Sequence, residues 1–452
     1  MFSLDRRWLV TGSLLAAIIG VASGLASALF LVVLAHATDI QTDHPWLLYG
    51  LPFAGMVIAW AYAGFGKSAA AGNNLLLDQI HAADEVNRVP LRMFPLVLAA
   101  TVLTHLFGGS AGREGTAVQM GGAIAGWLAR LLRLSATHLR VMLMCGIAGG
   151  FSSVFGTPLA GAVFGMEVLA LGGMRYDAMI PCLVAAIVGD LVVRGVGVHH
   201  GVYPVASGFP ELSVHTVLLV VIAGIAFGLA SLLFAEATAA IEHWSKRAVA
   251  NPLLRTFLGG IVVILITFAL GTRDYNGLSL PLLKACFTGA SIPAFAFLAK
   301  LLLTAVTLGV GFKGGEVTPL FVIGATLGVA LSGPLGMPPD TLAALGFVAV
   351  FAAAANTPIA CVVMGAEIFS SSGIILFGVT IFVAYTISGH RGIYHAQRIL
   401  VSKHLHPTYP HVGVSLRDAR LRQAPLHARV RSALPRRRRD AIVVVHEEKE
   451  AA

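Results

Sequence analysis

Long apolar stretches, separated by short polar segments, follow one another along most of the chain. A helix that crosses the roughly 30 Å hydrocarbon core of a bilayer needs about 20 apolar residues. Stretches of that kind lie near residues 8–36, 46–65, 92–108, 178–198, 214–240, 254–271 and 293–311. The pattern predicts an all-α polytopic protein that resides in a lipid bilayer.

Two regions, 112–172 and 314–388, show a less regular pattern. Gly and Pro interrupt their apolar sequence at short intervals, so the pieces look too short to cross a membrane singly. Helices broken in this way are found where a transporter builds a site inside the membrane. We therefore expect about 18 helical segments, several of which do not cross fully.

Composition agrees with this assignment. Of the 452 residues, 57% are hydrophobic and only 12% are charged, whereas soluble globular proteins have about a half and about a quarter. The four cysteines lie in apolar segments without ligand-like spacing, so we expect neither disulfides nor a metal site. No cofactor is expected.

Much of the net charge of +9 lies near the C-terminus, in Arg429, Arg431 and 436–439. Basic segments mark the cytoplasmic side of a membrane protein, and Arg6 and Arg7 put the N-terminus on the same side. We expect both termini to be cytoplasmic, which requires an even number of crossings. Binding of lipid headgroups or nucleic acid by the basic segment is the alternative, and we expect no nucleic acid partner.

Two motifs recur about two hundred residues apart, which indicates an internal duplication. Gly112-Arg113-Glu114-Gly115-Thr116 corresponds to Gly314-Gly315-Glu316-Val317-Thr318, and the run that begins at Thr157-Pro158 corresponds to Thr357-Pro358. We therefore divide the chain into a first repeat half (1–205), a second repeat half (206–400) and a basic cytoplasmic tail (401–452). The tail is expected to be partly disordered.

The duplicated acids Glu114 and Glu316 are the candidate functional residues. A carboxylate within a membrane segment is costly and usually lines an ion or proton path. Each stands where a helix should begin, and helix N-termini attract anions. An anion and an ionised Glu114 would compete for the same donors, so protonation of the carboxyl group would admit the anion. The alternative is a glutamate that only stabilises a helix end or pairs with Arg113.

Thr116 and Thr318 add hydroxyl donors at matching positions, with helix capping as their alternative role. Glu167 and Glu367 also recur, and we interpret them as structural or water-facing, with a place for Glu167 on an inner proton route as the alternative.

These residues resemble the chloride channel (CLC) family of anion channels and anion/proton antiporters. The resemblance covers about residues 10–400 and is carried by the Gly-Arg-Glu-Gly motif at Gly112, the Gly-Thr-Pro-Leu-Ala-Gly run at Gly156, and Tyr394. It implies a fold of two inverted-topology repeats, a homodimer with one pore per subunit, an external gate at Glu114, and an inner closure of the central ion site by Tyr394.

Three departures from the chloride-transporting pattern make the chain similar to the fluoride-exporting branch. Thr116 replaces a Pro, Val168 stands where an internal proton-transfer Glu falls, and Ala71-Gly72-Asn73-Asn74-Leu75 replaces the ion-binding Ser turn. In that branch the Glu matching Glu316 is thought to replace the missing internal Glu.

Fluoride is a strong hydrogen-bond acceptor, and an Asn amide offers two N–H donors. We take Asn73 as the match of the central Ser, with Asn74 as the alternative shifted by one residue, and a simple turn as the structural alternative.

The sequence thus predicts a fluoride/proton antiporter of the cell inner membrane, whose partners are fluoride and protons. A chloride/proton antiporter or chloride channel is the alternative. Glu114 and Glu316 carry protons, and the anion-binding residues are Asn73, Asn74, Gly112, Arg113, Gly115, Thr116, Val317, Thr318 and Tyr394. Ser110 matches the Gly-x-Ser-x-Gly hydrolase motif by letter, but that motif requires an α/β sheet, so we expect no enzyme.

Overall fold

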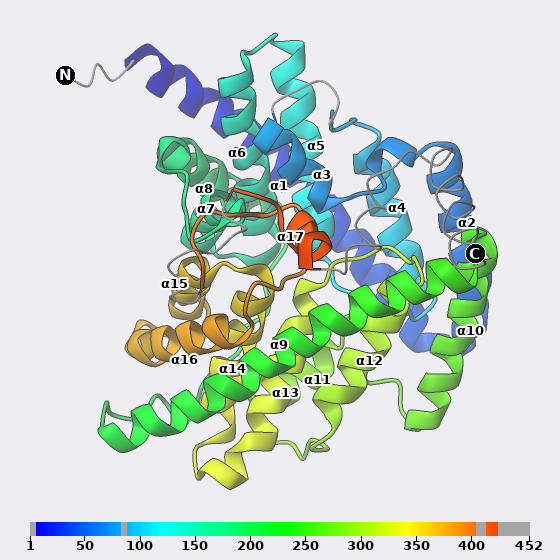
Figure 1. Ribbon diagram of the computed structural model, residues 1–452, viewed down its shortest axis with the longest axis vertical. Helices are drawn as coiled ribbons and strands as arrows, with labels where there is room; N and C mark the ends of the chain where they lie inside the picture. Colours follow the sequence, from blue (N-terminus) through cyan, green and yellow to red (C-terminus); the bar gives the residue numbers. More distant parts are fainter. Residues whose placement is uncertain (1–5, 83–87, 404–412, 424–452) are drawn as a thin grey trace, which may run out of the picture.

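The computed structural model describes residues 6–82, 88–403 and 413–423, which form 17 α-helices. A parallel pair of two-residue strands is the β-structure among these described residues. Figure 1 shows the helices as one assembly, with the early and late parts of the chain side by side. The predicted all-α polytopic fold is confirmed.

Sixteen of these helices, α1 to α16, fall into two series of eight with the same order. The first series comprises α1 (Arg6–Asp43), α2 (Leu51–Gly64), α3 (Asn73–Ala82), α4 (Met93–Leu106), α5 (Glu114–Leu131), α6 (Ala136–Phe155), α7 (Pro158–Glu167) and α8 (Met179–Gly195). The second series comprises α9 (Val214–Ala248), α10 (Pro252–Leu270), α11 (Leu280–Ala285), α12 (Ala296–Gly309), α13 (Val317–Leu335), α14 (Pro339–Ala355), α15 (Pro358–Ile368) and α16 (Ile374–Ile387).

Shorter elements connect them. They are the 3-10 helices Pro45–Gly50, Lys67–Ala69, Tyr176–Ala178 and Ser371–Gly373, the strands β1 (Ala170–Leu171) and β2 (Arg398–Ile399), and α17 (Leu416–Gln423).

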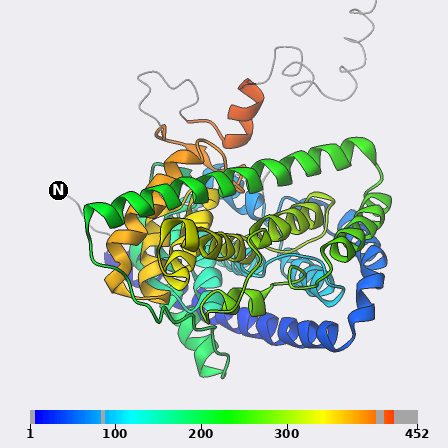
Figure 2. The same cartoon turned by 90° about the horizontal axis from the view of Figure 1, so that it is seen from below.

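Packing repeats along with the order of the helices. Each half begins with a long helix, of 38 residues in α1 and 35 in α9. α1 packs on α8 as α9 packs on α16, and α5 packs on α6 as α13 packs on α14. The two long helices run along opposite faces of the molecule (Figure 2).

Among the described residues, seven helices are long and apolar enough to cross a membrane, and they include α6 and α13. The expectation that every piece of 112–172 and 314–388 is too short was therefore wrong. The glycines of these two regions do not end the helices. They allow close contact between helices instead: a Cβ on Gly121 would meet the backbone of Gly146, and one on Gly324 would meet that of Gly346. Small residues let membrane helices approach closely in this way.

The segments 92–108 and 293–311 were predicted to be long enough to span the membrane, and this prediction was also wrong. Each forms a 14-residue helix, α4 and α12 respectively. In both cases the chain leaves the helix early to form the loop that leads to a duplicated acid.

The predicted tail is described only at 401–403 and 413–423. There α17 packs onto the first half through Leu416, which contacts the cluster around Leu171 and Ile399. Arg417 pairs with Asp78 at 3.3 Å and Arg420 with Glu236 at 2.5 Å. The arginines from Arg429 onward lie outside the described residues.

Candidate functional site

The loops before α5 and α13 meet at the centre of the fold. Gly112 N–H donates to Gly315 O at 2.6 Å, and Gly315 N–H donates to Gly112 O at 2.7 Å, which forms an antiparallel bridge. A Cβ on Gly112 would lie 2.9 Å from Gly315 O and 2.8 Å from Pro319 Cδ, so this approach requires glycine. The bridge brings the N-termini of α5 and α13 close together.

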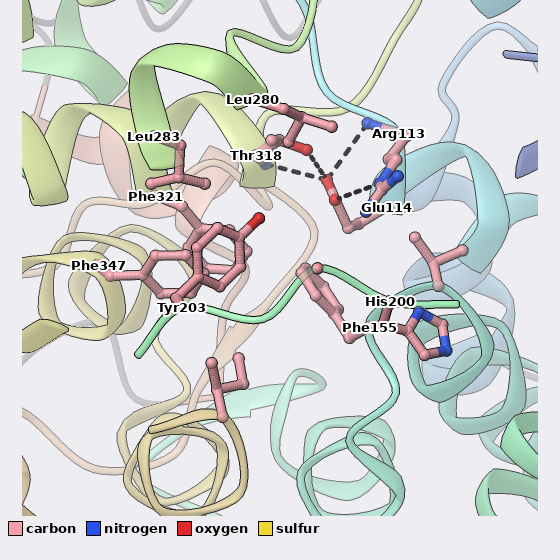
Figure 3. Close-up of a pocket in the computed structure, with 13 residues that line it drawn as sticks. Arg113, Glu114, Phe155, His200, Tyr203, Leu280, Leu283, Thr318, Phe321 and Phe347 are labelled. Carbon is pink, nitrogen blue, oxygen red and sulfur yellow. Dashed lines mark hydrogen bonds and ion pairs between the residues drawn. The ribbon is translucent and has the colours of Figure 1, made fainter. Parts of the chain in front are cut away.

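Glu114 is the first residue of α5, and its side chain reaches across to the second half (Figure 3). One carboxylate oxygen accepts hydrogen bonds from Thr318 N at 3.0 Å, Thr318 Oγ1 at 2.5 Å and Arg113 N at 3.2 Å. The other oxygen lies 3.4 Å from Arg113 Nε. Glu114 is only 1% exposed, so it caps the N-terminus of the opposite helix from inside the protein.

A small cavity of about 30 Å³ adjoins the Glu114 carboxylate. Tyr203, Phe321 and Phe347 line it on the side away from Glu114 (Figure 3). One water needs about 10–15 Å³, so the cavity admits a water molecule or a small ion and little else. We call it the Glu114 cavity.

Glu316 has different surroundings. It is the N-cap residue of α13 and is half-buried. Within the part of the chain that the structure describes, its carboxylate receives no hydrogen bond from another residue. It lines a larger cavity of about 160 Å³, together with Asn73, Asn74 and Tyr394, which we call the Asn73 cavity.

The two asparagines differ in their contacts. The Asn73 side-chain oxygen is buried and has no hydrogen-bond partner among the described residues. The Asn74 side-chain oxygen accepts from Ala396 N at 2.9 Å, so it ties α3 to the segment that carries Tyr394. Tyr394 is buried, and its ring stands edge-on to Phe164 at 6.5 Å between centroids.

The remaining predicted site residues divide into two groups. Gly115 packs on the Asn73 side chain, with 3.1 Å between a Cβ built there and Asn73 Nδ2, and Val317 is buried in the first turn of α13. Thr116 does not turn to this site, because its hydroxyl hydrogen-bonds Thr101 Oγ1 at 2.7 Å. The hydroxyl groups of Thr116 and Thr318 are thus not equivalent.

Val168 lies at the end of a narrow space of about 10 Å³ that it shares with Asn73, Phe164 and Tyr394. The space holds at most one water molecule. It therefore offers no room for a chain of waters between Val168 and the Asn73 cavity.

Glu167 and Glu367 form reciprocal caps between the halves. The Glu167 carboxylate accepts from Ile359 N at 3.0 Å and Ala360 N at 2.8 Å, at the start of α15. The Glu367 carboxylate accepts in the same way from the backbone N–H groups of 159 and 160, at the start of α7. This exchange favours the structural interpretation of both residues.

Sequence reasoning missed Lys300, which is fully buried in α12. Its ammonium lies 2.8–3.1 Å from four neutral oxygens, those of Ser110, Tyr275, Gly277 and Ser279, and its three N–H donors are shared among them. A lone lysine within an apolar helix was the available signal. The Ser110 hydroxyl also donates to Tyr275 O, so it helps to hold the loop that leads to Glu114.

Two inverted helical repeats whose helix N-termini meet at the centre of the fold are typical of the class of polytopic ion transporters and channels. Residues 54–389 match the family model described as voltage gated chloride channel. The chain belongs to this family, the CLC family, whose members are ion transporters or channels and not enzymes.

A relative from Pseudomonas syringae pv. tomato, named chloride/fluoride channel protein, is 49% identical over 90% of both chains. A solved structure described as a CLC-type fluoride/proton antiporter is 34% identical, with a TM-score of 0.84, and the match covers 88% of this chain and all of the other. The structure of a slow cyanobacterial Cl⁻/H⁺ antiporter, 20% identical over 83% of this chain and 94% of the other, has a TM-score of 0.72 and supports the fold alone.

Proposed function

We propose that the protein is a fluoride/proton antiporter of the cell inner membrane that exports fluoride as protons enter. The observation that carries the proposal is the Glu114 carboxylate, which occupies the N–H and O–H donors at the start of α13. An anion bound there would use the same donors.

Protonation couples the two ions through this competition. An ionised Glu114 fills the donor site and excludes the anion. A neutral Glu114 no longer competes with the anion for these donors. The anion therefore enters the site as the protonated side chain moves out of it. Exchange of the two ions then requires no conformational change beyond the movement of the Glu114 side chain.

Glu316 is the proposed second proton carrier. It faces the Asn73 cavity, which is large enough for several waters, whereas the space beside Val168 holds at most one. Glu316 therefore adjoins more room for water than Val168 does, which favours it as the proton carrier. Tyr394 lines the same cavity as Glu316 and Asn73, which supports its proposed contact with the anion.

Fluoride is the proposed substrate because the Asn73 cavity is lined with amides. Asn73, Asn74 and Gln119 all contribute to it, and amide N–H groups suit an anion that must exchange tightly held water for strong donors. We assign the anion contact to Asn73, since the Asn74 oxygen already holds Ala396. The names of the 49% and 34% identical relatives add support.

The proposal includes the predicted homodimer with both termini cytoplasmic. The basic residues near the two ends support that orientation. The mass of the purified protein in detergent, corrected for bound detergent, tests the dimer.

Ion flux from liposomes tests the function. Vesicles that contain the protein and are loaded with fluoride or chloride are diluted into anion-free buffer, and the released anion and the external pH are recorded together. We expect fluoride to leave much faster than chloride and to be exchanged for protons. Chloride release as fast as fluoride release would favour the chloride/proton antiporter, and anion release without proton movement would favour a channel.

An Asn73→Ser variant tests the selectivity assignment. It removes one amide donor, and a hydrogen bond to a charged partner is worth about 1.5–3 kcal/mol, so fluoride flux relative to chloride should fall about ten-fold. Asn74→Ser is the matched control, and an equal loss of selectivity there would remove the preference for Asn73.

A further inference from the structure

His200 is a second titratable side chain on the wall of the Glu114 cavity (Figure 3). It belongs to the segment 196–213, which connects α8 to α9, and Gly201 and Tyr203 of the same segment line the cavity as well. In the proposed exchange Glu114 has to gain and lose a proton, so a neighbouring group that can carry one bears directly on the gate.

The imidazole of His200 makes no hydrogen bond to the described residues. Both of its ring nitrogens are buried and lack a partner there. The ring packs on Gly156 at the end of α6, where a Cβ would lie only 2.3 Å from its Cδ2 atom. Buried polar atoms are normally satisfied by protein or by ordered water, and the Glu114 cavity offers room for water beside this ring.

Asp190, from α8, lies on the other side of His200. Its Oδ1 atom is 3.5 Å from His200 Nε2, and its side chain is only 6% exposed. The second oxygen accepts from Arg194 Nε at 2.8 Å, and Arg194 also donates to Gly156 O at 3.2 Å. At 3.5 Å the contact with His200 is an ion contact rather than a good hydrogen bond, and it leaves Nδ1 uncommitted.

The other charged or titratable groups near His200 are engaged or poorly suited to carry a proton. Arg113 pairs with Glu114, and Glu367 holds the N–H groups at the start of α7. Tyr203 lines the cavity, but a phenol gives up its proton only in alkaline solution. An imidazole gains and loses a proton near neutral pH, so His200 is the group of this set that suits proton exchange.

The cavity has the size of a short water bridge between His200 and Glu114. Its volume is about 30 Å³, and one water needs about 10–15 Å³. Phe155, Phe321 and Phe347 form much of the remaining wall, which limits entry of bulk water. The His200 side chain is 13% exposed, so it reaches both the solvent and the cavity.

We propose that His200, positioned by Asp190, is the proton shuttle of the Glu114 gate. The imidazolium gives a proton to a water in the cavity, and that water gives one of its own to the Glu114 carboxylate. A neutral imidazole and a neutral carboxyl group result, and the imidazole regains a proton from the solvent. The inference rests on the proposed function, because it requires a Glu114 that exchanges protons, but it does not depend on which halide is carried.

The first test is the pH dependence of initial fluoride release from liposomes. His200→Gln keeps a polar side chain of similar size that does not titrate, so exchange should slow roughly ten-fold in mildly alkaline buffer. It should approach wild type in mildly acidic buffer, where protons in water are more abundant. His199→Gln, at an exposed neighbour outside the cavity, is the matched control. An unchanged rate, or equal slowing at every pH, would overturn the shuttle.

The second test replaces the lost base from solution. His200→Ala leaves a hollow where the side chain reached the solvent, so imidazole, present at equal concentration on both sides of the membrane, should restore most of the fluoride release. Pyrazole has the same size but is a far weaker base, so it should restore little. Protein-free liposomes correct for leak of fluoride. Equal restoration by the two molecules, or none by imidazole, would overturn the shuttle.

Asp190→Asn tests the positioning residue. The carboxylate favours the imidazolium and an amide does not, so the fall of the exchange rate with rising pH should begin at lower pH than in wild type. An unmoved pH profile would exclude Asp190 from the shuttle.

The wild-type arm keeps the two proposals apart. If wild type exchanges chloride rather than fluoride for protons, the fluoride assignment fails, and the His200 variants are then compared with chloride. If wild type exchanges fluoride for protons and His200→Gln does so equally fast at every pH, only the shuttle fails.

Discussion

Glu114 and Glu316 occupy equivalent places in the two halves, yet their carboxylates have different surroundings. Glu114 is the first residue of its helix and is held by three hydrogen bonds, two of them from Thr318 in the other half. Glu316 is the residue before its helix and faces a cavity with room for several waters. One duplicated motif thus supplies a blocking carboxylate and an accessible one, a division that suits a gate and a relay.

The largest expected effect is at Glu114. Glu114→Gln keeps the size of the side chain but cannot titrate, so proton movement should fall roughly 100-fold or more while anion flux continues. Simultaneous recording of anion and pH in liposomes checks this. Glu167→Gln, which alters a buried capping carboxylate outside the two cavities, is the control. Intact proton exchange in Glu114→Gln would show that Glu114 is not the titrating gate.

The second effect is at Glu316. Glu316→Gln should reduce proton movement by about ten-fold, less than Glu114→Gln, because the Asn73 cavity has room for water that can take over part of the relay. The same flux assay measures it. Unaltered proton movement would leave Glu316 with a structural role only, and a loss equal to that of Glu114→Gln would show that the halves are not divided in this way.

The paired threonines sharpen the comparison. Thr318→Val removes a donor that the Glu114 site uses, so fluoride flux should fall about ten-fold. Thr116→Val removes only the hydrogen bond to Thr101, so it should lower the free energy of unfolding by about 1 kcal/mol with little effect on flux. Flux and thermal unfolding of both variants, measured in parallel, test the difference; equal flux losses would contradict it.

The smallest effect on transport is expected at the reciprocal caps. Glu167→Ala leaves the N–H groups of Ile359 and Ala360 without their acceptor, the second of them buried, which should cost about 1–3 kcal/mol of stability. Glu367→Ala should cost less, since that residue is half-buried and water can replace its carboxylate. Thermal unfolding followed by tryptophan fluorescence gives the order, and a larger loss for Glu367→Ala would contradict it.

The sequence predicted the features that the duplication exposes. Two matching motifs are enough to infer that Glu114 and Glu316 begin helices and that their loops converge, because each motif carries its own glycines and acid. The lengths of the helices could be predicted less well from the sequence. Glycine in α6 serves contact with α5 rather than a break, and sequence periodicity does not separate these roles.

Contacts between the halves could not be predicted. Nothing local to Thr116 or Thr318 states that one hydroxyl meets Thr101 and the other meets Glu114. The same holds for Lys300, whose oxygen partners lie at Ser110 and in the segment 275–279. These contacts depend on the relative placement of helices far apart in the chain, which one sequence without alignment does not report.

The bridge between Gly112 and Gly315 also bears on how the protein is made. The ribosome completes the first partner about two hundred residues before the second, and an unpaired peptide group in hydrocarbon costs several kcal/mol. The early loop therefore has to wait in an unfinished form, hydrated or sheltered by the insertion machinery. If the two halves were translated as separate fragments, they would have to associate in the bilayer before the bridge between Gly112 and Gly315 could form.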